Sequence, residues 1–330
     1  MSEPVNLLVD SFGRKHTYLR ISVTDRCNLR CQYCMPAAGL KWKEKAELLT
    51  FEEIEKLTRL FTAMGICKVR LTGGEPLVRK NLLRLVEMLW AVPGLKTLAM
   101  TTNATLLAPL AEALKHAGLK HLNISLDSFD RSRFQEITRM DALPEVMAGI
   151  ESAIAAGFPV LKLNMVPIAG FNDDEILDFA HFAQKHKINV RFIEFMPFKD
   201  NQWQADKVVT FAEMKARLEK HFHLEAMDQP QGEVARDYAL RGGGTVSFIT
   251  SMSESFCRSC NRLRLTSDGS MKSCLFFPPE INLRDALRQN APEEALRGMI
   301  LACLAGKPEA HPPAEEIAAA ENRSMIEIGG

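Results

Sequence analysis

The sequence predicts an α/β protein, a partial (β/α)6 barrel of the TIM type followed by a smaller C-terminal α+β extension. Three observations predict this fold. Short apolar runs alternate with amphipathic helical segments six times over the first two-thirds of the 330 residues, except that no helix follows the last run. Polar or Gly-rich residues follow each run, where barrel enzymes carry their functional groups. After about residue 220 the alternation stops, and Gly-rich turns and short strands follow.

The individual elements follow from their local patterns. Residues 50–65 show the helical one, because Thr50 is a good N-cap, Glu53 takes the capping-box position and Gly65 ends the segment. A doubly wound sheet is the alternative, but no G-x-G-x-x-G opens the first helix, which disfavours dinucleotide binding. The predicted strands are residues 18–23, 67–72, 95–102, 120–127, 160–166 and 190–196, and the predicted helices are residues 50–65, 81–90, 106–118, 143–157 and 173–186.

The C-terminal third reads as a second, smaller unit. Residues 228–248 are rich in Gly and turn formers and mark the change of pattern. Residues 305–324 have the composition of a mobile tail. We therefore expect a barrel over residues 1–225 and a smaller region over residues 226–330 that ends in a mobile Gly-Gly tail. Within it the sequence predicts short strands in residues 246–250 and 262–275 and helices over residues 282–289 and 292–304.

The composition is that of a globular protein with balanced charge. Apolar residues make up 46% and charged residues 25%, and 41 basic residues match 41 acidic ones. This balance disfavours general adhesion to nucleic acid or to anionic membranes, so we expect neither as a partner. No run of 18 apolar residues and no basic start with an apolar run behind it occurs. We therefore expect no membrane span, no signal peptide and a cytoplasmic location.

Three cysteines lie close together on the loop after the first predicted strand. Cys27, Cys31 and Cys34 have the spacing C-x3-C-x2-C. A reducing compartment disfavours disulfides, and thiolates this close suit an iron–sulfur cluster or zinc. Three thiolates on a cubane [4Fe–4S] cluster would leave one iron open for substrate chemistry. The alternative is a zinc site that a distant cysteine completes.

A second group of three cysteines lies in the C-terminal region. Cys257, Cys260 and Cys274 have the spacing C-x2-C-x13-C, again with three ligands rather than four. His221 or His223 could complete a structural zinc site, so zinc stays open as an alternative. The other two cysteines lie in apolar surroundings, and we interpret both as small buried hydrophobes: Cys67 and Cys303.

The first cysteine group resembles that of the radical S-adenosylmethionine superfamily. The resemblance rests on C-x3-C-x-Y-C-M at residues 27–35, with G-G-E-P at residues 73–76 after the next strand. It implies that the three thiolates hold a [4Fe–4S] cluster whose open iron is chelated by S-adenosylmethionine, which is cleaved to a 5′-deoxyadenosyl radical. It also implies S-adenosylmethionine contacts, with Glu75 in support, from Tyr33, Gly74, Ser125 and Met196.

More narrowly, residues 20–36 and 256–276 resemble the GTP 3′,8-cyclase family, which begins molybdenum-cofactor biosynthesis. Residues 192–197, residues 232–235 and the terminal Gly329-Gly330 match as well, so the resemblance covers nearly the whole chain. It implies a second [4Fe–4S] cluster on Cys257, Cys260 and Cys274, with an open iron that binds the purine of GTP. It also implies that Gly329 and Gly330 reach into the active site and support activity. Ala104 departs from the family pattern, because Gly commonly follows T-T-N there.

Basic side chains on four predicted strands, and two more after the second C-x2-C unit, could converge on a polyanion. Arginine forks suit phosphate oxygens in bidentate geometry. No P-loop motif is present, so side-chain cations would hold a triphosphate. For any single basic residue a surface ion pair is the simpler interpretation, but the resemblance favours the functional one for the set. It assigns GTP contacts to Arg20, Arg70, Thr101, Lys162, Arg191, Arg262 and Arg264.

The resemblance therefore predicts a lyase that makes (8S)-3′,8-cyclo-7,8-dihydroguanosine 5′-triphosphate from GTP by a radical reaction. It implies an electron donor and a downstream cyclic pyranopterin synthase-like enzyme as partners, and a homodimer is left open. No catalytic side chain is assigned from the sequence.

Three other functions stay open at this point. A peptide-modifying radical enzyme with an auxiliary cluster would lack the cationic set. An iron–sulfur electron carrier would need fully ligated clusters, and the C-x2-C-x2-C run typical of such carriers is absent. A zinc-stabilised RNA-binding module is disfavoured by a sequence pI near 7.

Overall fold

A computed structural model of the chain describes residues 7–36, 39–199, 201–229, 232–277, 281–320 and 324–329. At its centre, these described residues form one curved sheet of 12 strands in the order β12-β11-β10-β1-β2-β3-β4-β5-β6-β9-β8-β7. The strands are β1 (Tyr18–Ser22), β2 (Lys68–Thr72), β3 (Thr97–Thr102), β4 (His121–Ser125), β5 (Val160–Met165), β6 (Asn189–Ile193), β7 (Leu224–Ala226), β8 (Arg236–Leu240), β9 (Thr245–Ile249), β10 (Arg262–Leu265), β11 (Ser270–Lys272) and β12 (Ile281–Asn282).

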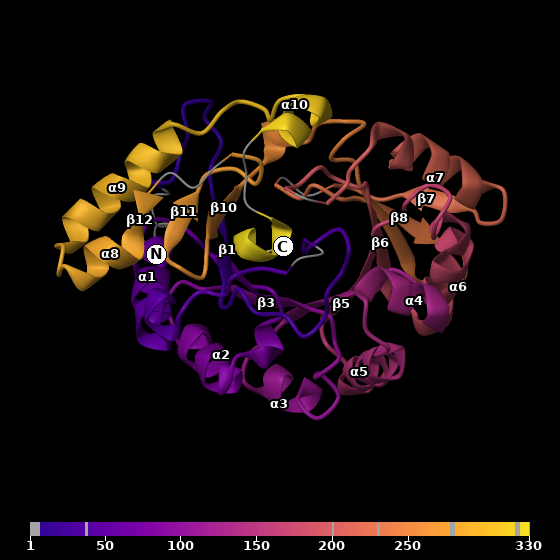
Figure 1. Ribbon diagram of the computed structural model, residues 1–330, viewed down its shortest axis with the longest axis horizontal. Helices are drawn as coiled ribbons and strands as arrows, with labels where there is room; N and C mark the ends of the chain where they lie inside the picture. Colours follow the sequence, from indigo (N-terminus) through magenta and orange to yellow (C-terminus); the bar gives the residue numbers. More distant parts are fainter. Residues whose placement is uncertain are drawn as a thin grey trace.

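Helices cover the outer side of this sheet. The helices are α1 (Phe51–Ala63), α2 (Leu82–Trp90), α3 (Ala111–His116), α4 (Arg131–Thr138), α5 (Leu143–Ala156), α6 (Ile176–His186), α7 (Phe211–Glu219), α8 (Leu283–Arg288), α9 (Glu293–Ala305), α10 (Ala314–Ala319) and α11 (Met325–Ile328). Figure 1 shows α1 to α7 around the outside of the sheet, α8 and α9 beside β11 and β12, α10 at the top, and the C-terminal helix α11 inside the curve.

The predicted partial barrel is confirmed. Strands β1 to β6 are parallel and neighbour one another in chain order, as six βα units require. The C-terminal strands extend the same sheet at both edges, because β10 pairs in parallel with β1 and β9 pairs in parallel with β6. Both ends of the barrel sheet are therefore completed by the last third of the chain.

Alternation along the strands sorts apolar from charged side chains. Leu19 and Ile21 of β1 are fully buried among the core residues beneath the helices. Arg20 lies between them and faces the other way, so it lines the interior of the curve together with Arg70 of β2. The charged residues of the barrel strands are thus directed inward.

Two helices before residue 225 escaped the sequence analysis for different reasons. Helix α4 carries only Phe134, Ile137 and Thr138 as buried residues, so its apolar periodicity is weak. Helix α7 begins with a capping box of Thr210 and Glu213, a signal that could have found it. Conversely, the helix predicted over residues 106–118 begins later than expected, because residues 106–110 form turns before α3.

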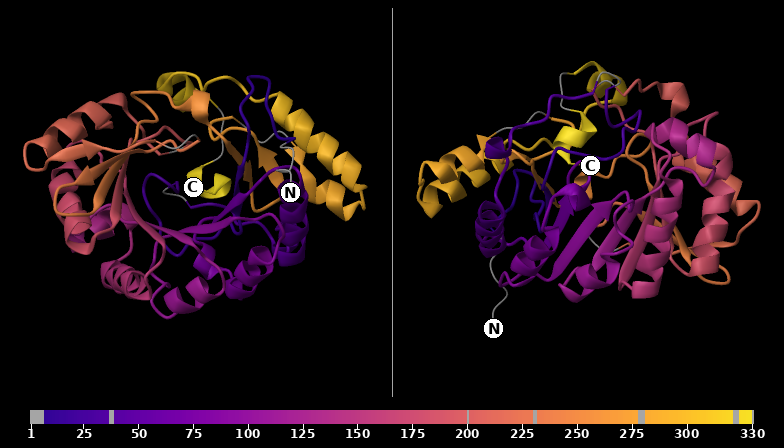
Figure 2. Two further views of the ribbon diagram at one scale, coloured as in Figure 1. Left: turned by 180° about the vertical axis from the view of Figure 1, so that it is seen from behind. Right: turned by 60° about the horizontal axis from the view of Figure 1, so that its bottom comes forward.

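The C-terminal segment folds back onto the barrel where the composition indicates a mobile tail. Ile317 of α10 and Ile328 of α11 join a buried cluster with Phe198 and Phe276, which gives this polar segment an apolar anchor. Figure 2 shows α11 inside the curve of the sheet from two further sides. In the described part of the chain no helix combines the length and the apolar character needed to span a bilayer.

Candidate active site

A cavity of about 480 Å³ occupies the inside of the curved sheet. Strands β1 to β6 and β8 to β10 and helix α11 all contribute residues to its walls. The structure brings together at this cavity every residue to which the resemblance assigns a contact with S-adenosylmethionine or GTP, namely Tyr33, Gly74, Ser125, Met196, Arg20, Arg70, Thr101, Lys162, Arg191, Arg262 and Arg264.

The strand register stacks the cations in rows. Arg20 of β1 lies opposite Arg70 of β2 on one side and Arg264 of β10 on the other. One position earlier on the same face, Tyr18 lies between Lys68 and Arg262. Parallel pairing in register thus converts an arginine or lysine at the same position of each strand into a cationic surface. Of the residues that the structure describes, seven Lys or Arg side chains line the cavity.

These cations repel one another where water is excluded. Burial, then Arg191, lowers the pKa of Lys162 to about 8. Burial, then Arg262, lowers the pKa of Arg264 to about 10. The carboxylates of Glu233 and Asp237 offset part of this charge. The remaining positive charge would be stabilised by a bound polyanion, because buried charges need partners.

Three hydrogen bonds hold the guanidinium of Arg70. Its Nε donates to Tyr18 Oη at 2.5 Å, and its Nη1 donates to the Met100 carbonyl at 2.8 Å and to Thr101 Oγ1 at 3.3 Å. Burial would raise the pKa of Tyr18, but Arg70, Arg20 and the nearby lysine outweigh it and lower that pKa to about 7. These contacts hold the guanidinium in place before any ligand arrives.

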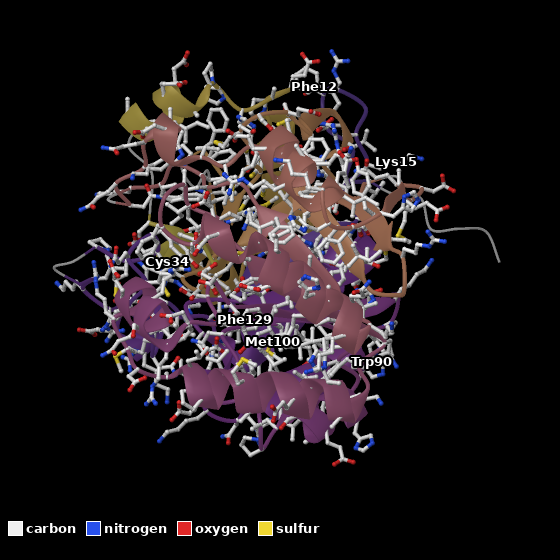
Figure 3. The ribbon with its side chains drawn as sticks, turned by 90° about the vertical axis from the view of Figure 1, so that its right-hand side faces the viewer. Phe12, Lys15, Cys34, Trp90, Met100 and Phe129 are labelled. Atoms are coloured by element: carbon white, nitrogen blue, oxygen red, sulfur yellow. The ribbon has the colours of Figure 1, made fainter. Side chains whose placement is uncertain are left out.

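The first cysteine trio lies at the carboxyl end of β1. Cys27, Cys31 and Cys34 all line the cavity. Burial raises the pKa of the Cys27 thiol to about 11, and burial followed by neighbouring thiolates raises the pKa of Cys31 and of Cys34 further. In Figure 3 Cys34 lies toward the left of the molecule, and Trp90, at the far end of α2, lies toward the right.

The G-G-E-P turn packs against this cysteine loop. The Gly74 amide donates to the Thr24 carbonyl at 2.9 Å, and the Glu75 amide donates to the Arg26 carbonyl at 2.8 Å. A Cβ on Gly74 would come within 2.3 Å of the Arg26 carbonyl oxygen, so only glycine permits this approach. The turn therefore fixes the start of the cysteine loop.

Glu75 joins the turn to the end of β3. Its side chain is 1% exposed and accepts hydrogen bonds from Thr102 Oγ1 at 2.7 Å and from the Asn103 amide at 2.6 Å. Burial raises the pKa of the Glu75 carboxyl to about 7 despite these donors. Burial likewise raises the pKa of the Asp127 carboxyl to about 6, and this carboxyl accepts a hydrogen bond from the Tyr33 hydroxyl.

We expect Glu75 to make stability fall as the pH rises. Its folded-state pKa of about 7 lies above the ordinary value of about 4.3, so the folded protein binds more protons between these values. The contribution of Glu75 to the free energy of unfolding is fully present below a pH of about 4.3. It falls by up to roughly 3 kcal/mol as the pH rises through 7. Anaerobic urea unfolding of wild type and Glu75→Gln at pH 5.5, 6.5 and 8 isolates this contribution. A difference between the two proteins that stays constant with pH would contradict it.

The second cysteine trio lies near the amino end of β10. Cys260 comes two residues before β10, which begins opposite Tyr18, whereas Cys27 comes after the carboxyl end of β1. Phe256 and Leu275, which adjoin Cys257 and Cys274 in sequence, line the cavity. The cavity therefore reaches from the first trio to the immediate neighbours of the second.

His311 is the histidine that the fold brings to this second trio. Burial would raise the pKa of Cys257, but hydrogen bonds from the His311 ring and amide help to lower it to about 7. The His311 ring also packs on Phe276 with centroids 4.9 Å apart. The histidines weighed from the sequence lie elsewhere, next to β7: His221 and His223. Arg14 Nη1 adds a 2.8 Å hydrogen bond to the Cys257 carbonyl.

The donor chemistry of both trios fits a cluster. Among the described residues no group of three or more His, Cys, Asp or Glu side chains is arranged to hold a metal ion. A cubane cluster binds each thiolate through a different iron, so its ligands need not converge on one ion. As thiolates, the buried cysteines of the first trio would repel one another. A cationic iron core would offset this negative charge.

The C-terminal tail reaches the same cavity. The Gly329 carbonyl accepts hydrogen bonds from Arg264 Nη1 at 3.2 Å and from Thr72 Oγ1 at 3.3 Å. Met325 and Ile326 of the tail line the cavity. Gly330 lies outside the described residues. The described tail thus touches one of the cations to which the resemblance assigns GTP.

The sequence analysis missed several polar residues of the cavity. Alternation along its strand places Lys68 on the same face as Arg70, but the sequence analysis assigned it no contact; it lines the cavity and pairs with Glu233 at 3.0 Å. The alternation of β4 could have revealed two more, His121 and Asn123, because they lie on the same face of the strand as Ser125, which was assigned to the site. Polar lining residues without an assignment from the sequence include His121, Asn123, Asp127, Asn164, Glu233 and Asp237.

Comparison with known proteins decides the family. The family model described as Radical SAM superfamily matches residues 21–183, and that described as Molybdenum Cofactor Synthesis C matches residues 188–313. The GTP 3′,8-cyclase, mitochondrial, of Arabidopsis thaliana is 48% identical over 98% of this chain and 84% of its own length. The chain belongs to the GTP 3′,8-cyclase family. GTP 3′,8-cyclase of Moorella thermoacetica is 46% identical over 97% of this chain and 99% of its own.

Members of the GTP 3′,8-cyclase family differ in length. Molybdenum cofactor biosynthesis protein 1 of Mus musculus is 46% identical over 98% of this chain, but the chain spans only 51% of that protein. As a member of the radical SAM superfamily, the cyclase family implies a [4Fe–4S] cluster and S-adenosylmethionine. The structure of Streptococcus suis SuiB bound to S-adenosylmethionine has a TM-score of 0.57 at 13% identity, over 86% of this chain and 68% of that one. That likeness supports the fold.

Proposed function

We propose that this protein is a radical S-adenosylmethionine lyase that converts GTP to (8S)-3′,8-cyclo-7,8-dihydroguanosine 5′-triphosphate, the first step of molybdopterin biosynthesis. The observation that carries the proposal is one cavity that, in the described part of the chain, joins a cysteine trio to seven Lys or Arg side chains. A peptide substrate would give no reason for so dense a cationic lining, whereas a triphosphate matches it in charge. The names of the family members agree with this substrate.

At the carboxyl end of the barrel, Cys27, Cys31 and Cys34 would hold the [4Fe–4S] cluster. The bound cluster and S-adenosylmethionine supply an electron and a 5′-deoxyadenosyl radical. The chain orients the cofactor from several sides. The hydrogen bond from Tyr33 to Asp127 fixes the aromatic ring, since Asp127 is itself held by the Val166 amide at 2.8 Å. The proposed S-adenosylmethionine contacts are Tyr33, Gly74, Ser125 and Met196.

In the middle of the barrel, the cations would hold the triphosphate and thereby place the ribose. Rows of arginines on β1, β2 and β10 offer forks that are already oriented, as Arg70 shows. Their role is to fix C3′ of the ribose where a hydrogen atom can be removed and C8 of the base can be reached. The proposed GTP contacts are Arg20, Arg70, Thr101, Lys162, Arg191, Arg262 and Arg264.

At the other end of the cavity, we propose a second [4Fe–4S] cluster on Cys257, Cys260 and Cys274, with the purine at its open iron. Support comes from the donor set and from Phe256 and Leu275, which carry the cavity wall to this trio. The tail residues Gly329 and Gly330 would support activity. We also keep as proposals a division of the chain after residue 225, an electron donor, a downstream pterin-forming enzyme and a cytoplasmic location, with no nucleic acid or membrane partner.

Anaerobic incubation tests the proposed function. Reconstituted protein is mixed with S-adenosylmethionine, dithionite and GTP, and nucleotides are analysed by mass spectrometry. We expect 5′-deoxyadenosine together with a product isomeric with GTP, and neither cyclised product nor stimulation with ATP or a peptide mixture. Formation of 5′-deoxyadenosine that GTP does not stimulate would point to another radical enzyme. Complete absence of 5′-deoxyadenosine would overturn the radical chemistry itself.

A further inference from the structure

Asn123 is a polar cavity residue without an assigned role. It lies on β4 directly between Thr101 of β3 and Lys162 of β5 in the strand register. It lines the cavity, and its side chain is only 3% exposed. Its two neighbours are both proposed GTP contacts, so Asn123 lies at the level of the nucleotide. One step along the strands, Ser125 pairs with Asn164 at the level proposed for S-adenosylmethionine.

Among the described residues, the Oδ1 atom of Asn123 has no hydrogen-bond partner. This oxygen is buried and accepts no hydrogen bond from any of the residues that the structure describes, Lys162 included. A buried carbonyl oxygen without a donor is costly, and native proteins rarely leave one so. The χ2 torsion of asparagine is soft, so a small rotation can turn this oxygen to the cavity. The group is therefore an acceptor that a ligand can satisfy.

The chemistry of a nucleotide limits what can satisfy it. Phosphate oxygens only accept hydrogen bonds, so the triphosphate held by the cations offers no donor to Oδ1. The donors of GTP are the ribose hydroxyls and the N–H groups of the base. The base is proposed to lie toward the second trio, beyond Arg262, whereas Asn123 lies between Thr101 and Lys162. At this level the ribose is the part of the substrate that carries donors.

We propose that Asn123 accepts a hydrogen bond from a ribose hydroxyl of the nucleotide and so makes the site selective for ribonucleotides over deoxyribonucleotides. This inference rests on the proposed function, since it takes GTP as the ligand. For the reaction, such a contact would orient the ribose. A contact to O2′ or O3′ fixes the rotation of the sugar about the glycosidic bond and therefore the direction of the C3′ hydrogen. Asn123 is thus a specificity-determining and positioning residue.

The test compares the removal of the protein group with the removal of the ligand group. Binding of GTP, 2′-deoxyGTP and 3′-deoxyGTP is measured by equilibrium dialysis against the reconstituted protein without reductant, so no chemistry intervenes. In the wild type we expect one of the two deoxy analogues to bind roughly tenfold more weakly than GTP. In Asn123→Ala we expect GTP to lose a similar factor, and that analogue to bind as well as GTP does. The analogue affected identifies the hydroxyl.

Two further variants make the outcome specific. Asn123→Asp keeps an acceptor oxygen, so the ratio of GTP to deoxy-analogue affinity should be retained even if both affinities fall. Asn189→Ala is the matched control, because Asn189 Oδ1 is also buried and unpaired among the described residues but Asn189 does not line the cavity. Its ratio should equal that of the wild type. Iron content and thermal midpoint show whether each variant is folded and loaded.

Turnover gives an independent readout. With GTP deuterated at C3′, Asn123→Ala should transfer less deuterium into each 5′-deoxyadenosine formed, because the sugar is less well oriented. Equal affinity ratios in wild type and Asn123→Ala for both analogues would overturn the inference, as would equal binding of all three nucleotides to the wild type. If instead the wild type makes no cyclised product from GTP, the proposed function fails, whatever the ratios are.

Discussion

Cys27→Ala is expected to abolish formation of 5′-deoxyadenosine, whereas Cys257→Ala is expected to retain it and lose only the cyclised nucleotide. The reason is the position of the two trios. Cys27 lies in the loop packed on the G-G-E-P turn, and Cys257 lies on the other side, near the start of β10. Removing one thiolate at the first site takes away the proposed S-adenosylmethionine cluster, while removal at the second disturbs only the proposed purine site.

The measurement separates the two clusters within one set of reactions. 5′-Deoxyadenosine and cyclised nucleotide are quantified from the same anaerobic mixture, with iron and acid-labile sulfide determined for each variant. Cys67→Ala is the control, because Cys67 lies outside both trios, directly before β2, and is half-buried rather than buried as expected from the sequence. It should keep both products and the full iron content. Loss of 5′-deoxyadenosine in Cys257→Ala with the first cluster intact would contradict the division of roles.

Gly329→Ala is expected to lower cyclised product by roughly 100-fold while leaving the thermal midpoint nearly unchanged. Gly329 has φ +83, and a Cβ there would lie 2.6 Å from Ser22 Cβ and 2.8 Å from Thr72 Oγ1. Both the positive φ and the contact oppose alanine, so the tail must withdraw from Arg264. The core beneath the helices does not depend on this contact, so global stability changes little.

A glycine in a regular helix provides the comparison. A Cβ on Gly298, inside α9, meets nothing within 4 Å. Gly298→Ala should therefore be neutral or stabilising, by about 0.5–1 kcal/mol, with full turnover. Steady-state rates and thermal midpoints of both variants are compared under the same loading. Wild-type turnover in Gly329→Ala would show that the tail contact is not needed.

The sequence was most informative where local pattern and chemistry coincide. Strands β1 to β6 were predicted because their apolar runs are local, whereas the cavity cations were assigned through the family resemblance, and the structure brings Arg20 and Arg70 together at the cavity. Glu233 lies before β8 in a Gly-containing segment with no periodicity, so its pairing with Lys68 depends on tertiary placement alone. The same holds for His311, which reaches Cys257 only because the tail folds back.

The joining of distant strands was beyond sequence pattern for a different reason. β10 and β9 carry ordinary strand signals, but nothing local says that they add to opposite edges of the first sheet. Their partners are chosen by the edges that β1 and β6 leave open. Periodicity gives the existence of a strand and its inward face, and non-local pairing decides its neighbour.

The completion of both sheet edges by late strands also bears on how the chain folds. β1 is made early during synthesis but acquires its second neighbour, β10, only after some 240 further residues, as the register of Tyr18 with Arg262 shows. Until then the nascent barrel presents two unpaired parallel edges, at β1 and at β6, and such edges invite pairing with other chains. A chain stopped near residue 225 should therefore aggregate, and slow, chaperone-sensitive maturation is the expected kinetic signature of this topology.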